Sequence, residues 1–210
     1  MTNLKVELLF ITPQAELLIE NVGRTSYLSF PKQQAGSEKN FIRMLLRNEH
    51  HSVLEHAYAT FRIAGVSRAC THQLVRHRLC SFIQQSQRYV DEKDFRYIEP
   101  ESIKANAEAH AMFTEFMEQA RAIYTKLQGM KIRKEDARYV LPNATESQIV
   151  VSANFREWRH IIGLRGSPQS QWEIRRLAIA VLKILKEHAP TVFADFQVDE
   201  EKEVINKLKI

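Results

Sequence analysis

The sequence predicts an α+β fold in which an antiparallel or mixed sheet packs with several long helices. Short β-branched and alternating runs indicate strands, and longer segments with apolar residues at helical spacing indicate helices. The strands are scattered between the helices, which is typical of the α+β class. The 210 residues suffice for a sizeable core, and no repeat, low-complexity tract or linker divides the chain. We therefore expect one domain over residues 1–210.

The first strand is expected over Leu4–Thr12, a β-branched and leucine run that a proline stops. A helix should follow to about Asn21. Ser37 is a plausible N-cap for the next helix, which should end near the histidines that follow it. From Ala57 to Val66 the apolar residues alternate with period two, which predicts a strand with one buried face. The face expected to be buried carries Ala57, Ala59, Phe61 and Ile63.

The second half of the chain predicts helices around one further strand. Ser67–Val75 is expected to be helical, and Pro100–Leu127 supports a long helix that Gly129 ends. Ser147–Phe155 is compatible with a strand, and Gln171–Glu187 with the last long helix. The apolar residues that indicate the first long helix are Ile103, Met112, Phe116, Ala120 and Ile123. Those of the last helix, expected to be buried, are Ile174, Leu177, Ala178, Val181 and Leu185.

The composition favours an anionic partner without naming it. Thirty Lys and Arg against 25 Asp and Glu give a formal net charge of +5. A nucleic-acid-binding module is the alternative from another class, but acidic residues are interleaved throughout and no helix-turn-helix, RNP or zinc signature is present. No N-terminal apolar segment is long enough for export or a membrane span, and two cysteines form no disulfide framework. We expect a cytoplasmic protein without a membrane partner.

The stretch LVRHRLCSFIQQSQRY, Leu74 to Tyr89, concentrates hydrogen-bond donors. In a regular helix, Arg76 and Arg78 could not both face one ligand with the histidine between them, whereas in an extended turn they would share a side. Further on, Ser81, Gln84, Gln85 and Arg88 have helical spacing. A solvated basic helix is one explanation. However, lysine and glutamate are absent, and Ser, Gln and Arg together can bind a uracil-like edge and a phosphate. A small nucleotide is therefore a plausible ligand.

The same stretch resembles the signature of flavin-dependent thymidylate synthases. RHR at Arg76–Arg78 is followed by seven residues, then by the serine of SQRY at Ser86–Tyr89. Further blocks similar to the family's follow the expected order along almost the whole chain. They are RTSY (24–27), HHSVLEH (50–56), ARYVLP (137–142) and NFREWRHIIGLRGSPQSQWEIR (154–175).

The resemblance implies an enzyme and its ligands. Members of this family transfer the methylene group of methylenetetrahydrofolate to dUMP and reduce it with hydride from FAD, which NADPH reduces. The products are dTMP and tetrahydrofolate. The expected cofactor is therefore FAD, with NADPH and methylenetetrahydrofolate as co-substrates and no nucleic acid as partner. The family also implies its own fold and a homotetramer whose active sites form between subunits. No G-x-G-x-x-G sequence is present, so FAD would not be held by a Rossmann half.

Site residues follow from the resemblance, position by position. Arg165 corresponds to the arginine that polarises the pyrimidine, and Ser86 to an orienting hydroxyl; these are the expected catalytic residues. The positions expected to bind FAD are Ser26, His50, Ser52, Arg76, His77, Arg78, Gln84, Asn154, Arg156, His160 and Leu164. Those expected to bind dUMP are Gln73, Arg76, Gln84, Gln85, Ser86, Gln87, Arg88, Arg138 and Arg165. The sequence departs from the common pattern at Phe82, Ile83 and Gln169, and Gln169 stands where many members carry histidine.

Several side chains have a second interpretation. Ser86 has been read as a nucleophile in this family, but no local base activates it in this sequence. Cys70 and Cys80 are expected to be small buried side chains with no role. Trp158 and Trp172 could stack on a ligand, although their helical apolar spacing favours packing. The five histidines His50, His51, His56, His72 and His77 suggest a metal, but their spacing is poor and we expect none.

Overall fold

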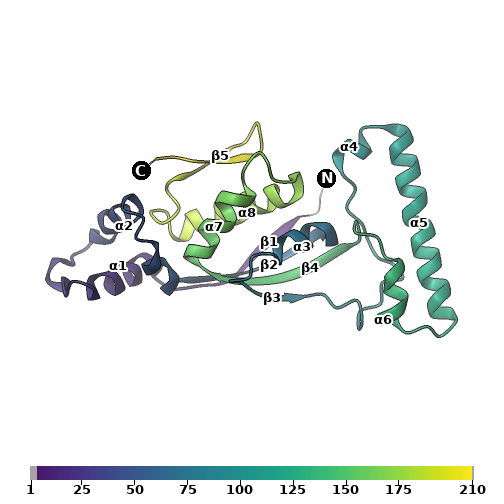
Figure 1. Ribbon diagram of the computed structural model, residues 1–210, viewed down its shortest axis with the longest axis horizontal. Coiled ribbons are helices and arrows are strands. Elements are labelled where there is room, and N and C mark those ends of the chain that lie inside the picture. The colour runs from purple at the N-terminus through teal and green to yellow at the C-terminus, as the bar shows by residue number, and fades with distance from the viewer. Residues whose placement is uncertain (1–3, 210) are drawn as a thin grey trace. The chain divides into compact units, whose positions relative to one another are not determined.

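The computed structural model describes residues 4–209 and confirms the α+β fold class (Figure 1). Four strands form one sheet in the order β1-β2-β4-β3, and two strands form an antiparallel ribbon, β5-β6, in which Phe196 pairs with Lys207. The strands are β1 (Lys5–Ile11), β2 (Tyr58–Ser67), β3 (Ser81–Gln84), β4 (Glu146–Asn154), β5 (Phe196–Asp199) and β6 (Val204–Lys207).

The chain forms two compact units. Among the described residues, the first unit comprises 4–5, Ile63–Leu74 and Ile83–Ile149, and the second comprises Val6–Arg62, Val75–Phe82 and 150–209. In the first unit the helices are α3 (Arg68–Leu74), α4 (Glu101–Lys104), α5 (Ala107–Gly129), α6 (Lys134–Ala137) and the 3-10 helix η3 (Arg138–Val140). In the second they are α1 (Ala15–Thr25), α2 (Ser37–Arg47), α7 (Phe155–Arg165), α8 (Trp172–His188) and the 3-10 helices η1 (Phe30–Lys32) and η2 (His51–His56).

The core of the second unit is built around Trp158 of α7. Its indole is fully buried, donates a hydrogen bond from Nε1 to the carbonyl of Ala59 at 3.0 Å, and meets the Phe61 ring edge to face at 5.1 Å. A buried indole needs such a partner for its N–H. The prediction that Trp158 packs in the core is therefore confirmed, as is the buried face of β2 and that of α8.

A buried ion pair joins α7 to the segment before β5. Arg159 donates to both carboxylate oxygens of Asp195, at 2.6 and 2.5 Å, and also to the carbonyl of Val192. The guanidinium also lies 4.9 Å from the centroid of the Phe196 ring. Two parallel charge-assisted bonds fix the relative direction of the two groups, and loss of one partner would leave a buried charge. This pair therefore fixes the C-terminal segment against α7.

The first unit has a smaller core under α5. Phe95, Met117 and Ala120 are buried there, and Tyr124 on the same helix is fully buried. Asn106 begins the helix as its N-cap, because its side chain accepts hydrogen bonds from the backbone N–H groups of Glu108 and Ala109. The end of the helix at Gly129 agrees with the prediction.

Two local predictions were wrong. Ser37 is not an N-cap: the helix is preceded by Gly36 at φ 82°, and the Ser37 hydroxyl donates to Glu20 at 2.6 Å instead. The segment 100–127 holds two helices rather than one. The helical spacing of residues 81–88 is not used, because β3 occupies Ser81–Gln84. The ribbon β5-β6 was not predicted.

The apolar stripe expected along α5 also differs. Met112, Phe116 and Ile123 are exposed, while Met117 and Tyr124 are buried beside Ala120. The buried face is therefore rotated by about one residue, or about 100° around the helix.

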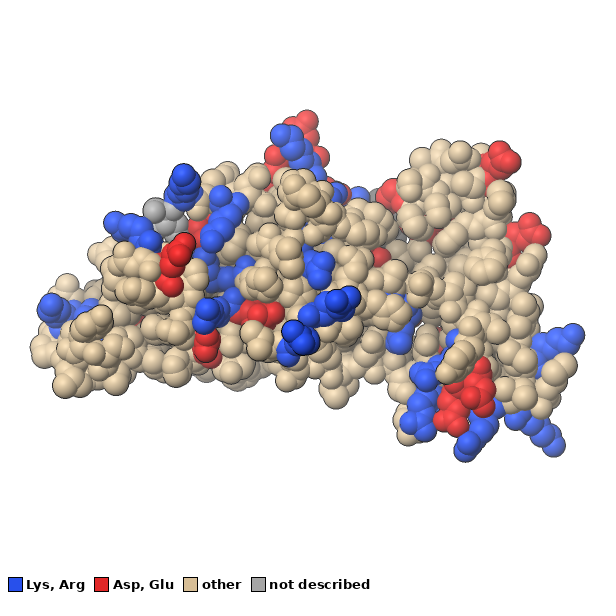
Figure 2. All heavy atoms as spheres, viewed as in Figure 1, with Lys and Arg blue, Asp and Glu red and all other residues tan. Residues whose placement is uncertain are grey.

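The charges on the surface are mixed in sign. On the face shown in Figure 2, the Lys and Arg side chains lie among Asp and Glu side chains. None of the helices within residues 4–209 has the length and apolar character needed to cross a membrane.

We predict that Gly166→Ala destabilises the protein by about 1–3 kcal/mol, the usual cost of overpacking a core. A Cβ at Gly166 would lie 2.5 Å from Ile205 Cδ1 and 2.7 Å from the carbonyl oxygen of Ile162. The backbone of Ile205 is hydrogen-bonded to Gly166 and cannot move away freely. Gly129→Ala is the matched control, since a Cβ there meets nothing within 4 Å. Urea unfolding midpoints measure both, and equal midpoints would contradict the prediction.

Candidate active site

The RHR motif lies in the turn between α3 and β3. This turn, residues 75–80, is not helical, and it buries His77 while Arg76 and Arg78 remain exposed on either side of it. The three side chains therefore do not share one environment. The motif presents two arginines to solvent and places the imidazole inside the second unit.

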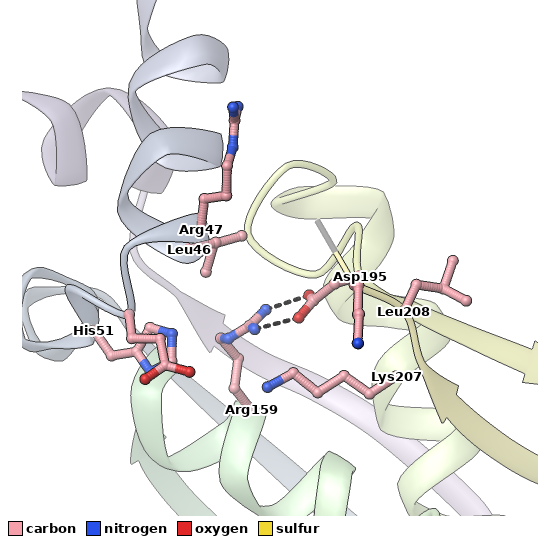
Figure 3. Close-up of a pocket in the computed structure, with 9 residues that line it drawn as sticks. Leu46, Arg47, His51, Arg159, Asp195, Lys207 and Leu208 are labelled. Carbon is pink, nitrogen blue, oxygen red and sulfur yellow. Dashed lines mark hydrogen bonds and ion pairs between the residues drawn. The ribbon is translucent and has the colours of Figure 1, made fainter.

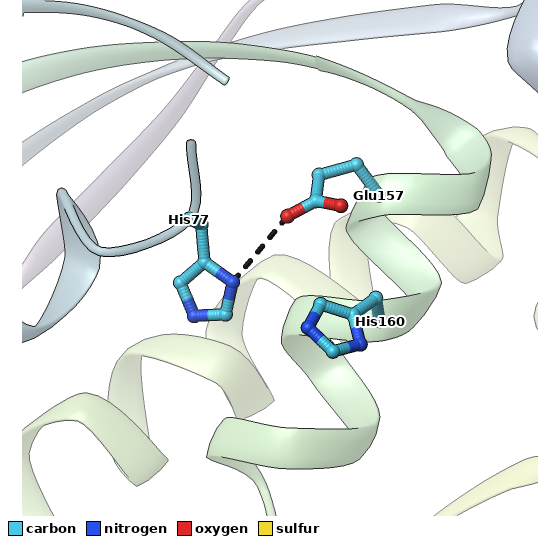
Figure 4. Close-up of side chains that lie close together, drawn as sticks. All are labelled: His77, Glu157 and His160. Atoms are coloured by element: carbon cyan, nitrogen blue, oxygen red, sulfur yellow. Dashed lines mark ion pairs between the residues drawn. The ribbon is translucent and has the colours of Figure 1, made fainter. Parts of the chain in front are cut away.

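His77 meets three residues of α7 (Figure 4 shows two of them). Arg165 donates from Nε to His77 Nε2 at 2.9 Å, and a carboxylate oxygen of Glu157 lies 3.4 Å from His77 Nδ1. The ring of His160 stands at 5.5 Å and 67° to that of His77, an edge-to-face arrangement. The structure thus brings together three predicted site residues, His77, His160 and Arg165, with Glu157, which was not predicted.

The imidazole of His77 is neutral at physiological pH. Burial, together with the smaller effects of the Arg165 and His160 charges, lowers its pKa from 6.5 to about 4. Burial also raises the pKa of Glu157, which His160 partly opposes. The contact between His77 and Glu157 is therefore that of a neutral ring with a carboxyl group, not a full ion pair.

The first turn of α7 lines a pocket of about 570 Å³. Asn154 is the N-cap of the helix, and its side chain accepts from the Glu157 N–H at 2.8 Å. Arg156 is exposed and pairs with Glu55 at 2.5 Å. The lining residues are Glu55, Leu79, Asn154, Arg156, Glu157 and His160. Volumes of this order are typical of small-molecule sites.

Three of the lining residues, Asn154, Arg156 and His160, are among those the resemblance assigns to FAD. Four other such positions of the same unit are exposed: Ser26 just after α1, His50 and Ser52 around the start of η2, and Leu164 near the end of α7.

A second pocket of the same unit, of about 380 Å³, holds no predicted site residue (Figure 3). Its lining includes Arg47, His51 and Lys207 around the paired Arg159 and Asp195. Burial and the neighbouring charges of Arg159 and Lys207 lower the pKa of His51.

The residues that the resemblance assigns to dUMP lie mostly in the first unit. Gln84 donates from its amide to Thr71 at 2.8 Å and to Ser147 at 3.2 Å, and Gln85 donates to Glu92 at 3.0 Å. Gln87 is 9% exposed, and Gln73 is half-buried on α3. These contacts hold the two amides 84 and 85 in fixed directions on and just after β3.

Arg88 and Arg138 both contact Glu135. Arg88 donates from Nε to the Glu135 carboxylate at 3.1 Å, and Arg138 donates from Nε to the Glu135 backbone carbonyl at 3.1 Å. The structure therefore brings together two arginines that are fifty residues apart in the sequence. Burial, and then the charge of Arg138, lowers the pKa of Arg68 on the neighbouring helix α3.

Ser86 has no neighbouring base in the part of the chain that the structure describes. Its hydroxyl oxygen accepts a hydrogen bond from the Arg88 N–H at 3.3 Å, and within residues 4–209 neither a histidine nor a carboxylate contacts it. A serine nucleophile needs such a base. The described residues therefore do not supply the base that the nucleophile interpretation requires.

The cysteines are not placed as nucleophiles. Cys70 is fully buried on α3, as expected, and Cys80 is half-buried. Burial, with the nearby Glu157 carboxylate, raises the pKa of the Cys80 thiol to about 12. The reactive thiolate is therefore scarce at neutral pH.

Glu55, Leu79 and Glu157 are pocket residues that sequence reasoning missed. All three lie inside or beside motifs already quoted, HHSVLEH, RHRLC and NFREWRH. The signal that could have found Glu157 is its position at the third residue of α7, three residues after Asn154, on the first helical turn.

The cluster His77, Glu157 and His160 also has the composition of a metal site. One potential ligand atom from each residue lies within 4.8 Å of the others. The sequence interpretation considered His77 together with four other histidines, but neither Glu157 nor His160, and expected no metal.

Comparison with known proteins identifies the chain. Residues 7–191 match the family described as "Thymidylate synthase complementing protein". A flavin-dependent thymidylate synthase from Corynebacterium efficiens is 44% identical over 202 residues, which cover 88% of this chain and 81% of that relative. One from Mycobacterium tuberculosis is 43% identical over 198 residues, covering 86% and 79%. The crystal structure of thymidylate synthase X from Helicobacter pylori with FAD and dUMP superposes with a TM-score of 0.77 at 25% identity, covering 91% of this chain and 98% of that one.

The fold and the matched family define the class as a thymidylate synthase enzyme. By its similarity to the curated relatives over most of its length, the chain belongs to the flavin-dependent thymidylate synthase family. The resemblance drawn from RHR and SQRY, and the expectation of an enzyme, are confirmed.

We predict that His77 makes the protein less stable as the pH falls from 6.5 toward 4. In this window the unfolded chain, with the ordinary pKa of 6.5, binds a proton that the folded chain, with a pKa of about 4, does not. The free energy of unfolding therefore rises with pH, by at most about 1.4 kcal/mol per pH unit for one group. His77→Gln removes this contribution. In urea unfolding between pH 4.5 and 6, the free energy of unfolding of this variant should therefore rise less steeply with pH than that of the wild type. Equal slopes would contradict the shifted pKa.

Proposed function

We propose that this protein converts dUMP to dTMP by reductive methylation. Methylenetetrahydrofolate would supply the one-carbon unit and leave as tetrahydrofolate, and NADPH would supply the hydride through FAD. The observation that carries the proposal is the similarity over 91% of this chain to a structure solved with both FAD and dUMP.

FAD is proposed to lie against the pocket of α7 and the RHR turn. A dinucleotide carries a pyrophosphate, and the exposed guanidinium groups of Arg76, Arg78 and Arg156 are suited to bind it. The pocket of about 570 Å³ beside Arg156 supports this placement, because it presents amide, imidazole and guanidinium donors together. The other positions proposed to contact FAD are Ser26, His50, Ser52, His77, Gln84, Asn154, His160 and Leu164. When bound, FAD would supply the hydride-transfer chemistry.

The residues proposed to hold dUMP would recognise its base and phosphate. Arg88 and Arg138, which share Glu135, provide cations for the phosphate, and Gln84 and Gln85 provide fixed amides for the base edge. Ser86 would orient the nucleotide through its hydroxyl. The remaining proposed contacts are Gln73, Arg76, Gln87 and Arg165.

Arg165 is proposed to polarise the pyrimidine. A cation at the N3/O2 side of uracil stabilises negative charge there and increases the electron density at C5, the atom that attacks the one-carbon unit. In a site with little water, a guanidinium that is already held in place needs no reorganisation as this charge develops. Its bond to His77 Nε2 supports such a fixed position.

A single functional domain, a homotetramer and a cytoplasmic location also belong to this proposal. Met112, Phe116 and Ile123 are exposed on α5 at spacings of four and seven residues, and they support assembly because exposed apolar surface often marks a protein interface.

The first test is spectroscopic. The purified protein should show the absorption of a bound flavin between about 300 and 550 nm, and NADPH should bleach it under anaerobic conditions, faster with dUMP present. Adding methylenetetrahydrofolate should then yield dTMP. A protein that neither carries nor takes up FAD would overturn the proposal.

We predict that Arg165→Ala loses at least about 100-fold in dTMP formation while FAD stays bound, as is usual when one electrostatic stabiliser is removed. Arg62→Ala is the control, since Arg62 is a half-exposed arginine that pairs with Glu7 outside the proposed site. Product formation and the flavin spectrum are measured on both. Turnover by Arg165→Ala at the wild-type rate would remove the role given to this residue.

A further inference from the structure

We propose that Glu157 and His77 are positioning residues that aim the guanidinium of Arg165 through a buried chain of polar contacts. The inference rests on the proposed function of Arg165 and adds Glu157, a residue outside the predicted site, to it. Glu157 contacts one edge of the imidazole at 3.4 Å, and Arg165 contacts the other at 2.9 Å. The guanidinium would therefore be held through the ring by a carboxyl group on the same helix.

The contacts determine which ring nitrogen of His77 carries the proton. Arginine only donates hydrogen bonds, so Nε2, which faces Arg165 Nε, must be the unprotonated acceptor. In a neutral imidazole the proton then resides on Nδ1, the nitrogen that faces the Glu157 carboxylate. The carboxylate thus favours the one tautomer in which His77 can accept from Arg165.

The position of His77, Glu157 and Arg165 in the fold makes this series of polar contacts rigid. Glu157 and Arg165 come from the first turn and the last residue of α7, and His77 comes from the turn 75–80. Side chains on a helix point back toward its N-terminus, which is the direction from Arg165 to His77. The side chains of His77 and Glu157 are only 3% and 7% exposed. Little water can therefore replace these contacts.

Glu157 also has a purely structural interpretation. It stands three residues after the N-cap Asn154, where a glutamate can complete a capping box and stabilise the positive end of the helix. The carboxylate instead lies beside His77 Nδ1, as Figure 4 shows. The experiment must distinguish support of the helix from support of Arg165.

A metal ion is the other possible occupant of the cluster. Coordination by Nδ1 of His77 would need that nitrogen to be unprotonated, whereas the bond from Arg165 requires it to carry the proton. The guanidinium next to the ring would also repel a cation. A metal at His77, Glu157 and His160 is therefore incompatible with this chain of contacts. The observed hydrogen bond from Arg165 favours the chain of contacts over the metal.

A double-mutant cycle on the FAD-loaded enzyme tests the proposal. Glu157→Ala, Glu157→Gln, Arg165→Lys and the double variant Glu157→Ala with Arg165→Lys are compared for dTMP formation, dUMP affinity, flavin content and Tm. Glu203→Ala is the matched control, because it removes a carboxylate that pairs with Arg176 in the same unit but outside the pocket.

We expect Glu157→Ala to lower kcat on the order of 10- to 100-fold, since misplacing a catalytic group by about 1 Å has effects of this size. Glu157→Gln should stay within about fivefold of wild type because its amide oxygen can take the place of the carboxylate oxygen beside Nδ1. In the Arg165→Lys background, Glu157→Ala should change kcat by less than about twofold, as for residues that act as one unit. An equal loss in both backgrounds, or a Tm drop that accounts for the loss, would overturn the positioning role.

The tautomer of His77 provides a readout that does not depend on turnover. In ¹⁵N spectra of histidine-labelled holoenzyme, the ring of His77 should carry its proton on Nδ1 in the wild type and lose this preference in Glu157→Ala. A proton on Nε2 in the wild type would overturn the inference whether or not the enzyme makes dTMP. If the wild type made no dTMP but showed the Nδ1 proton, the proposed function would fail and the chain of contacts would stand.

Discussion

The burial of α7 is the constraint on which the candidate site depends. Trp158 is fully buried and bonded to the carbonyl of Ala59, and Arg159 is paired with Asp195 inside the same unit. A helix fixed at these two neighbouring residues can neither rotate nor slide without exposing an unpaired charge or an unbonded indole. The side chains that α7 carries on its other faces, from Asn154 to Arg165, therefore have fixed starting points. Precise chemistry needs this kind of support beneath the groups that perform it.

Along the same helix, buried ionisable groups occur in two different arrangements. Arg159 meets Asp195 in a two-bond pair, so each charge is compensated where it lies. Glu157 and His77 are buried with weaker compensation. Burial raises the pKa of Glu157 and lowers that of His77, so it favours the neutral form of each group. The first arrangement stabilises the fold. The second leaves polar groups whose state depends on their neighbours, which is common at functional sites.

The sequence predicts elements best where the apolar pattern is long and regular. The period-two run of β2 and the helical run of α8 are both found as expected, because buried faces of ten residues or more leave one consistent orientation. The four-residue strand β3 and the ribbon β5-β6 are too short to show a period. Candidate site residues could be proposed from RHR, SQRY and the block around Arg165, whereas the meeting of His77 with Glu157 and Arg165 could not be predicted. His77 lies eighty or more positions before the other two residues, and only the packing of a turn against α7 brings it to them.

The raised pKa of Cys80 has a consequence for the chemical durability of the protein. A reduced flavin exposed to oxygen produces peroxide, and peroxide oxidises thiolates to sulfenic acid far more readily than it oxidises thiols. The Cys80 thiol, buried next to the Glu157 carboxylate, has a pKa of about 12 and therefore stays protonated at the pH inside a cell. Cys80, two residues after the RHR motif, is therefore protected from oxidation by peroxide.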